Sequence, residues 1–135
     1  IIKDGEGATK ILEVDVKNAL SPSQAKKLCY AIANSNLVKT AIYGEDPNWG
    51  RIIAKIGSVE NIDFDVKKVK LYLNKILVFK SGIATSDAKS SKLKKSMKRR
   101  NIIISLSLGA GEKGSSIITA DLTKKYVDIN SAYTS

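Results

Sequence analysis

Two glycine-flanked acidic segments hold the side chains best suited to chemistry in this sequence. Residues 4–10 read Asp-Gly-Glu-Gly-Ala-Thr-Lys, and residues 44–51 read Gly-Glu-Asp-Pro-Asn-Trp-Gly-Arg. The carboxylates of the first segment would repel a phosphate group. The glycines on either side of Glu6, however, allow a ligand to approach closely and the carboxylate to hold an ammonium group. An acidic turn that simply begins a strand accounts for the same residues, and the local spacing alone favours that interpretation.

The second segment has the residue types of a rigid structural turn. Pro47 disfavours helical backbone at the residue before it, and Asn48 can cap a helix that follows. Trp49, the only tryptophan, is expected to anchor the loop by packing. We therefore interpret this loop as structural.

A third glycine-bearing segment matches a dinucleotide-binding pattern only in part. Glycines at 109, 111 and 114 give the spacing G-x-G-x-x-G, but a cofactor loop of that kind must be followed by a helix whose N-terminus holds the pyrophosphate. The residues that follow, Ser-Ser-Ile-Ile-Thr over 115–119, are typical of a strand. We predict a flexible hairpin tip between two antiparallel strands instead of a cofactor site.

The residue types that are missing exclude several classes of catalyst. The sequence has no histidine, which removes Ser-His and Cys-His pairs and zinc sites built on imidazole. Its one cysteine, Cys29, cannot form a disulfide within the chain, which fits a reducing, cytoplasmic compartment. No apolar run reaches the roughly 18 residues of a membrane helix, and we expect neither a membrane span nor an export signal.

The charge balance is strongly basic. Lysine and arginine number 23 against 13 acidic residues, a net charge of +10. The densest basic stretch, residues 89–100, contains no aromatic side chain on which a base could stack. We predict the solvated face of a surface helix there and expect no specific nucleic-acid partner, and we keep a basic polyanion-binding module as the alternative function.

The hydrophobic patterns predict an α+β fold with a mixed or antiparallel sheet, packed helices and one domain over residues 1–135. Alternation predicts a half-buried strand over 10–17. Ser21, Pro22 and Gln24 form a helix N-terminus, and Cys29 lies on the apolar stripe of that helix, so we expect a core thiol. The other predicted elements are an apolar segment over 37–43, a helix opening near Asn48 and ending at Gly57, a hairpin of 69–73 and 76–79, a weak helix over 86–98, and strands over 101–108 and 116–120.

Three segments of the sequence together resemble the ornithine acetyltransferase (glutamate N-acetyltransferase) family of arginine biosynthesis. They are residues 4–10, residues 33–51 and the C-terminal residues 120–135, so the resemblance runs from end to end. The resemblance implies that a precursor cleaves itself before a threonine, which becomes the nucleophile of the β chain and accepts acetyl from N-acetylornithine for transfer to glutamate. Some members also use acetyl-CoA as donor.

The resemblance also implies partners and site residues. Glu6 is similar to a substrate-pocket glutamate of the family, and Asn130 and Ser135 are similar to its C-terminal substrate contacts. The nucleophilic threonine is expected upstream of this chain, so no catalytic residue lies within it. The α chain of the precursor would supply the oxyanion hole and associate as α2β2, with no cofactor or metal. We expect this chain, as the C-terminal part of the β chain, to be inactive alone.

Overall fold

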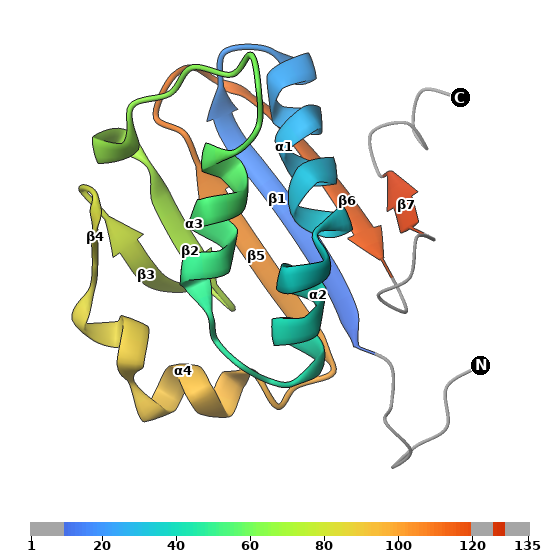
Figure 1. The fold of residues 1–135 in the computed structure, drawn as a ribbon, viewed down its shortest axis with the longest axis vertical. Helices are drawn as coiled ribbons and strands as arrows, with labels where there is room; N and C mark the ends of the chain where they lie inside the picture. Colours follow the sequence, from blue (N-terminus) through green and yellow to red (C-terminus); the bar gives the residue numbers. More distant parts are fainter. Residues whose placement is uncertain (1–9, 120–125, 129–135) are drawn as a thin grey trace.

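The computed structural model describes residues 10–119 and 126–128, and all structural statements below refer to these residues. They form seven strands in one sheet, four α-helices and two 3₁₀ segments. Figure 1 shows the arrangement. The strands are β1 Ile11–Ala19, β2 Lys70–Leu73, β3 Ile76–Lys80, β4 Ile83–Ala84, β5 Asn101–Ser107, β6 Lys113–Thr119 and β7 Tyr126–Asp128. The helical segments are α1 Pro22–Asn34, α2 Asn36–Tyr43, α3 Trp49–Gly57, η1 Val66–Lys68, η2 Ser86–Lys89 and α4 Ser91–Ser96.

Strand β1 lies inside a mixed sheet. The strand order is β4-β3-β2-β5-β1-β6-β7, with β1 parallel to β5 and antiparallel to β6. Leu12, Val14 and Val16 of β1 are buried, whereas the residues between them are partly exposed. The predicted alternating strand and the predicted α+β class with a mixed sheet are confirmed.

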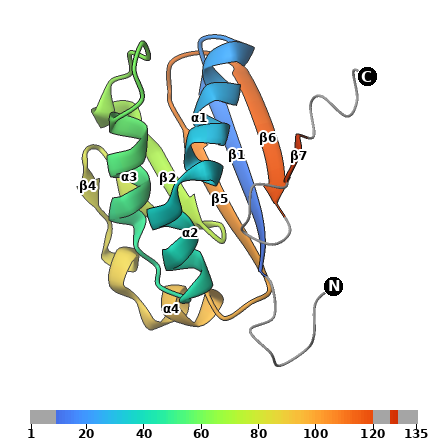
Figure 2. The same ribbon diagram turned by 45° about the vertical axis from the view of Figure 1, so that its right-hand side comes forward.

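Helices α1, α2 and α3 cover one face of this sheet, as the two views of the ribbon show (Figures 1 and 2). Helix α1 begins as predicted: the Ser21 hydroxyl accepts a hydrogen bond from the Gln24 amide, and the Gln24 side chain accepts one from the Leu20 amide. Its buried stripe includes Cys29, whose Sγ lies 3.2 Å from the Ser115 carbonyl oxygen. The thiol is therefore a core group, as predicted.

The apolar segment after α1 forms a second helix. Ser35 ends α1, because its amide donates to the Ile32 carbonyl, and it caps α2, because its hydroxyl accepts from the Val38 amide at 3.2 Å. One serine thus separates two helices. No helix of the described residues is both long and apolar enough to cross a membrane.

The hairpin of β2 and β3 turns at Asn74 and Lys75, as predicted. Both residues have positive φ, 52° and 69°, which the tightest two-residue hairpin turns require. The Asn74 side chain also accepts a hydrogen bond from the Ile103 amide and donates one to Ser96 Oγ, each at 2.9 Å. The turn is therefore attached to α4 and β5.

The predicted hairpin around the third glycine segment is wrong. Strands β5 and β6 run in opposite directions, but β1 lies between them and pairs with both. The connection therefore crosses the end of β1, and its glycines permit close backbone approach: a Cβ at Gly111 would lie 2.5 Å from the Ala19 carbonyl oxygen. A strand, β6, and not a helix follows Gly111, as expected, and Gly114 is the second residue of that strand.

Candidate functional site

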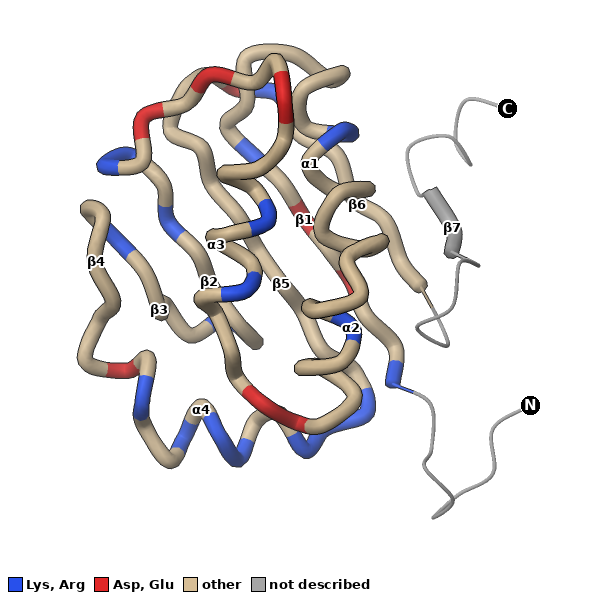
Figure 3. The backbone as a smooth tube through the Cα atoms, viewed as in Figure 1, with Lys and Arg blue, Asp and Glu red and all other residues tan. Residues whose placement is uncertain are grey.

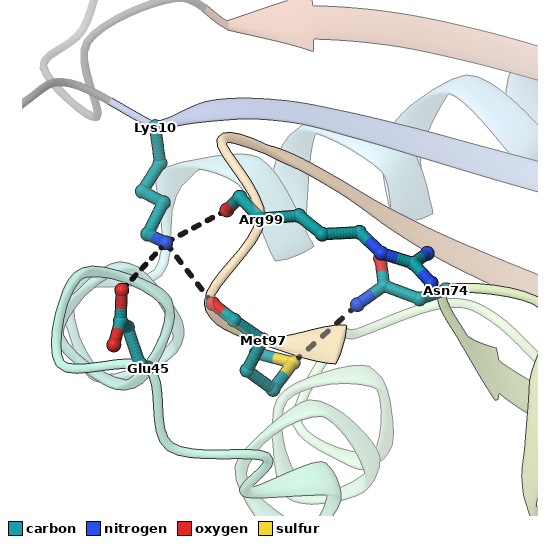
Figure 4. Close-up of polar contacts among 5 residues, drawn as sticks. All are labelled: Lys10, Glu45, Asn74, Met97 and Arg99. Carbon is teal, nitrogen blue, oxygen red and sulfur yellow. Dashed lines mark hydrogen bonds and ion pairs between the residues drawn. The ribbon is translucent and has the colours of Figure 1, made fainter. Parts of the chain in front are cut away.

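A buried lysine, Lys10, ends the first acidic segment and directly precedes β1. The side chain of Lys10 is 8% exposed. Its Nζ donates to Glu45 Oε2 at 2.9 Å, to the Met97 carbonyl oxygen at 3.0 Å and to the Arg99 carbonyl oxygen at 2.7 Å (Figure 4). An ammonium group has three hydrogens, so each has an acceptor. This full set of partners makes the burial of a charge possible.

The loop that carries Glu45 is held at both ends. Glu45 follows α2 in the left-handed conformation, with φ of 58°, and its amide donates to the Ile42 carbonyl oxygen. On the other side, Asn48 caps α3 by accepting from the Arg51 amide. The ring centroids of Trp49 and Phe79 lie 5.7 Å apart. The predicted cap and packing anchor are confirmed, and the loop presents a fixed carboxylate to Lys10.

The two carbonyl acceptors belong to the turn between α4 and β5. The Met97 side chain is fully buried, and its Sδ lies 3.7 Å from Asn74 Nδ2. Around this turn the basic side chains are exposed, in line with the predicted solvated face; they include Lys92, Lys94, Lys95, Lys98, Arg99 and Arg100. Figure 3 shows the basic positions along the backbone of α4 and the turn that follows it. Residues 89–100 contain no aromatic side chain, so this stretch itself offers no group on which a base could stack.

Glu6, Asn130 and Ser135, the residues predicted to bind substrate, lie outside the described residues. Their convergence on one pocket stays a prediction. The described strands show where the flanks of the two segments lie. Lys10 leads into β1, and Asp128, the last residue of β7, precedes residues 129–135. Asp128 pairs with Ile117 of β6, and Ile117 pairs with Val14 of β1. Two interstrand spacings, about 10 Å, therefore separate the end of β7 from Val14, three residues beyond the start of β1.

Two neighbouring carboxylates lie on β1, apart from the Lys10 site. Glu13 and Asp15 are two residues apart, so they share the sheet face opposite the buried Leu12 and Val14. Partial burial raises the pKa of Glu13, and the hydrogen bond and charge of Asp15 raise it further, while Lys75 opposes them. Ser116 Oγ donates to Asp15 at 2.6 Å. Among the described residues, no group of three or more carboxylates or thiolates is arranged to hold a metal ion.

The Lys10–Glu45 contact is the feature that sequence reasoning missed. The two residues are 35 positions apart, and nothing in the local pattern pairs one lysine with one glutamate. The sequence contains only an indirect indication of this contact: Lys10 ends the first acidic segment, and Glu45 lies in the second. The structure brings Lys10, the last residue of the first segment, into contact with Glu45 of the second.

The fold and the site together define an α+β domain with a mixed sheet, in which a buried ammonium joins two glycine-bearing acidic segments. The ArgJ family model matches residues 1–135, and the chain belongs to the ArgJ family. This result agrees with the resemblance in the sequence.

Individual relatives support the same assignment. The arginine biosynthesis bifunctional protein ArgJ of Nitrobacter winogradskyi is 45% identical over the whole chain, and that of Caldanaerobacter subterraneus is 44% identical over 98% of it. The match covers 32% and 34% of those proteins, so the chain spans about a third of their length. The crystal structure of ArgJ from Bacillus halodurans matches with a TM-score of 0.77 and 36% identity, covering 96% of this chain and 61% of that one.

Proposed function

We propose that this chain is the C-terminal part of an acetyltransferase of arginine biosynthesis, which moves an acetyl group from N-acetylornithine to glutamate. The observation that carries the proposal is the match of the ArgJ family model to residues 1–135. The relatives from Nitrobacter winogradskyi and Bradyrhizobium diazoefficiens are both named bifunctional proteins of arginine biosynthesis. Use of acetyl-CoA as a second acetyl donor to glutamate would agree with the word "bifunctional" in the names of these relatives.

The proposed reaction consists of two acyl transfers. The hydroxyl of an N-terminal threonine outside this chain attacks the acetyl carbonyl, the amide C–N bond breaks, and ornithine leaves with the proton on its amine. The glutamate amine then attacks the acetyl-threonine ester, and the threonine oxygen regains its proton. The threonine's own amine serves as the base, which suits a sequence without histidine.

Within this chain we assign substrate binding to Glu6, Asn130 and Ser135. The Glu6 carboxylate would pair with an ammonium group of the substrate, a charge-assisted contact. The Asn130 amide and the Ser135 hydroxyl would bind the amino-acid end by hydrogen bonds. The pairing of β6 with both β1 and β7 supports this assignment. Strand β1 follows the segment with Glu6 in the sequence, strand β7 precedes the segment with Asn130 and Ser135, and β6 holds these two strands in one sheet.

The rest of the proposed enzyme comes from the remaining polypeptide. The precursor would cleave itself before the nucleophilic threonine, and the α chain so released would supply the oxyanion hole. The two chains would form an α2β2 unit in the cytoplasm. The proposed reaction uses no cofactor and no metal, and neither a nucleic acid nor a membrane is a proposed partner.

Acetyl transfer by the full-length precursor tests this function. We expect N-acetylornithine and glutamate to yield ornithine and N-acetylglutamate. We expect Glu6→Ala to lower kcat/KM for N-acetylornithine by at least about tenfold, because a charge-assisted hydrogen bond is lost. The measurement is steady-state release of ornithine.

Glu60→Ala is the matched control, since Glu60 is an exposed glutamate distant in sequence from the predicted site residues. It should leave kcat/KM within about twofold, as expected for an exposed position. Full activity in Glu6→Ala would remove Glu6 from the site. Turnover by residues 1–135 alone would contradict the placement of the nucleophile, and a wild-type precursor without acetyl transfer would contradict the function.

A further inference from the structure

We propose that Lys10 is a positioning residue of the acetyl-transfer site, with Glu45 as its partner. The proposal rests on the function proposed above. In this view the buried ammonium holds the point at which residues 4–9 join β1, and it thereby sets the position of the substrate-binding Glu6. Lys10 does not contact the substrate in this account. It acts through the backbone of the segment that precedes it.

The first support is the origin of the three acceptors. They come from positions 35, 87 and 89 residues away along the chain, on two separate turns. The amide of the next residue, Ile11, donates to the Arg100 carbonyl oxygen at 2.9 Å. Side chain and backbone therefore attach the same point of the chain to the turn between α4 and β5.

The second support is the rigidity of both turns. The Glu45 carboxylate comes from a loop fixed by α2 and by the cap of α3. The turn at Met97 is fixed by Asn74, which donates to Ser96 Oγ and accepts from the Ile103 amide. Because other contacts hold the backbone of both turns, the two carbonyl acceptors and the backbone that carries Glu45 have defined positions around the ammonium.

The third support is energetic. Desolvating an ammonium is costly, and a buried ion pair is weak evidence of net stabilisation, since an apolar side chain of similar size is often as stable. Here the Lys10 side chain is buried and the Glu45 side chain is 43% exposed. Solvent therefore screens the ion pair and reduces its contribution to stability further. The buried ammonium of Lys10 instead supplies a defined geometry. Its nitrogen can donate to all three acceptors at once from only one position.

The fourth support is the short chain between Lys10 and Glu6. Four residues span at most about 14 Å, so an anchor at Lys10 limits the positions that Glu6 can reach. Both residues of the ion pair also lie in the two segments that carry the family resemblance, residues 4–10 and 33–51. A positioning role gives a reason for the contact between Lys10 and Glu45.

The test is a double-mutant cycle in the full-length precursor, with variants Lys10→Met, Glu6→Ala and the pair together. Lys10→Met should raise KM for N-acetylornithine by about tenfold and leave kcat within about threefold, because the nucleophile lies elsewhere and only substrate binding is weakened. Adding Lys10→Met to Glu6→Ala should leave KM unchanged, since Lys10 acts through Glu6. The readouts are KM, kcat and melting temperature for each variant.

Ser96→Ala is the matched control. It removes the hydroxyl that accepts from Asn74 Nδ2 and donates to the Leu93 carbonyl, so it loosens the same turn without touching Lys10. A merely structural side chain should behave like Ser96, with a lower melting temperature, a smaller active fraction and an unchanged KM. That pattern for Lys10→Met would overturn the proposal, as would a full additional rise in KM on the Glu6→Ala background. A wild-type precursor without acetyl transfer would overturn this proposal together with the function.

Discussion

Glu13 is the residue whose protonation responds most clearly to the fold. It is partly exposed on β1, and its pKa lies above the ordinary value of 4.5 because burial disfavours the carboxylate. The hydrogen bond and charge of Asp15 add to the shift, and Lys75 across the sheet reduces it. A raised pKa means that the folded state binds its proton more tightly than the unfolded state does. The contribution of Glu13 to the free energy of unfolding is therefore fully present below its ordinary pKa. That contribution is lost as the pH rises through the raised pKa of the folded state.

Glu13→Gln should therefore stabilise the protein in a pH-dependent way. Glutamine cannot ionise, so the melting temperature of the variant relative to wild type should increase as the pH rises from about 4 to 7. Thermal unfolding of the full-length protein at both pH values measures the difference. Glu112→Gln, at an exposed position between β5 and β6, controls for the loss of a carboxylate. A variant that melts below wild type at pH 7 would contradict this account of Glu13.

At the scale of elements, Gly111 in the connection between β5 and β6 is required by its close contact with β1. The backbone of the connection donates twice to the Asn18 carbonyl oxygen, from Ala110 at 2.8 Å and from Gly111 at 2.9 Å. A Cβ at Gly111 would meet the Ala19 carbonyl oxygen at 2.5 Å, whereas nothing lies within 4 Å of one at Gly57 in α3. The two positions therefore differ in whether they can accept a side chain.

Gly111→Ala and Gly57→Ala should consequently have opposite effects on stability. The first forces two backbone segments apart and should destabilise by about 2–3 kcal/mol. The second removes backbone freedom from the unfolded chain in a helix and should stabilise by about 0.5–1 kcal/mol. Denaturant unfolding of the two full-length variants, monitored by hydrogen exchange of the amides around each substituted glycine, measures both changes in the free energy of unfolding. Equal effects from the two substitutions would mean that the connection does not pack on β1 as described.

Local sequence patterns predicted most elements because their causes are local. Ser21 caps α1, Asn48 caps α3, and the turn at Asn74 and Lys75 forms between strands that are adjacent in sequence. The connection after β5 was mispredicted because its cause is distant. The strand that lies between β5 and β6 is β1, about ninety residues earlier, and no pattern within residues 101–119 reveals it. The ion pair of Lys10 was missed for the same reason.

At the scale of the molecule, we propose that this chain is one part of a larger acetyltransferase. It spans about a third of the length of its curated relatives, and its family follows from three segments that together reach both ends of the sequence. The proposed function could be inferred from those segments, whereas the contact between Lys10 and Glu45 became apparent only from the fold. The structure describes β1 and β7, which are adjacent in sequence to the segments with the proposed site residues, and the buried Lys10. The substrate-binding residues are assigned by resemblance.

A structure of the full-length protein with N-acetylornithine bound tests the central claim most directly. The account predicts that Glu6, Asn130 and Ser135 each lie within hydrogen-bond distance of the ligand, about 2.7–3.2 Å between heavy atoms. It also predicts that the acetyl group faces a threonine hydroxyl from polypeptide outside residues 1–135. A ligand bound away from the start of β1, with Glu6 pointing elsewhere, would contradict it.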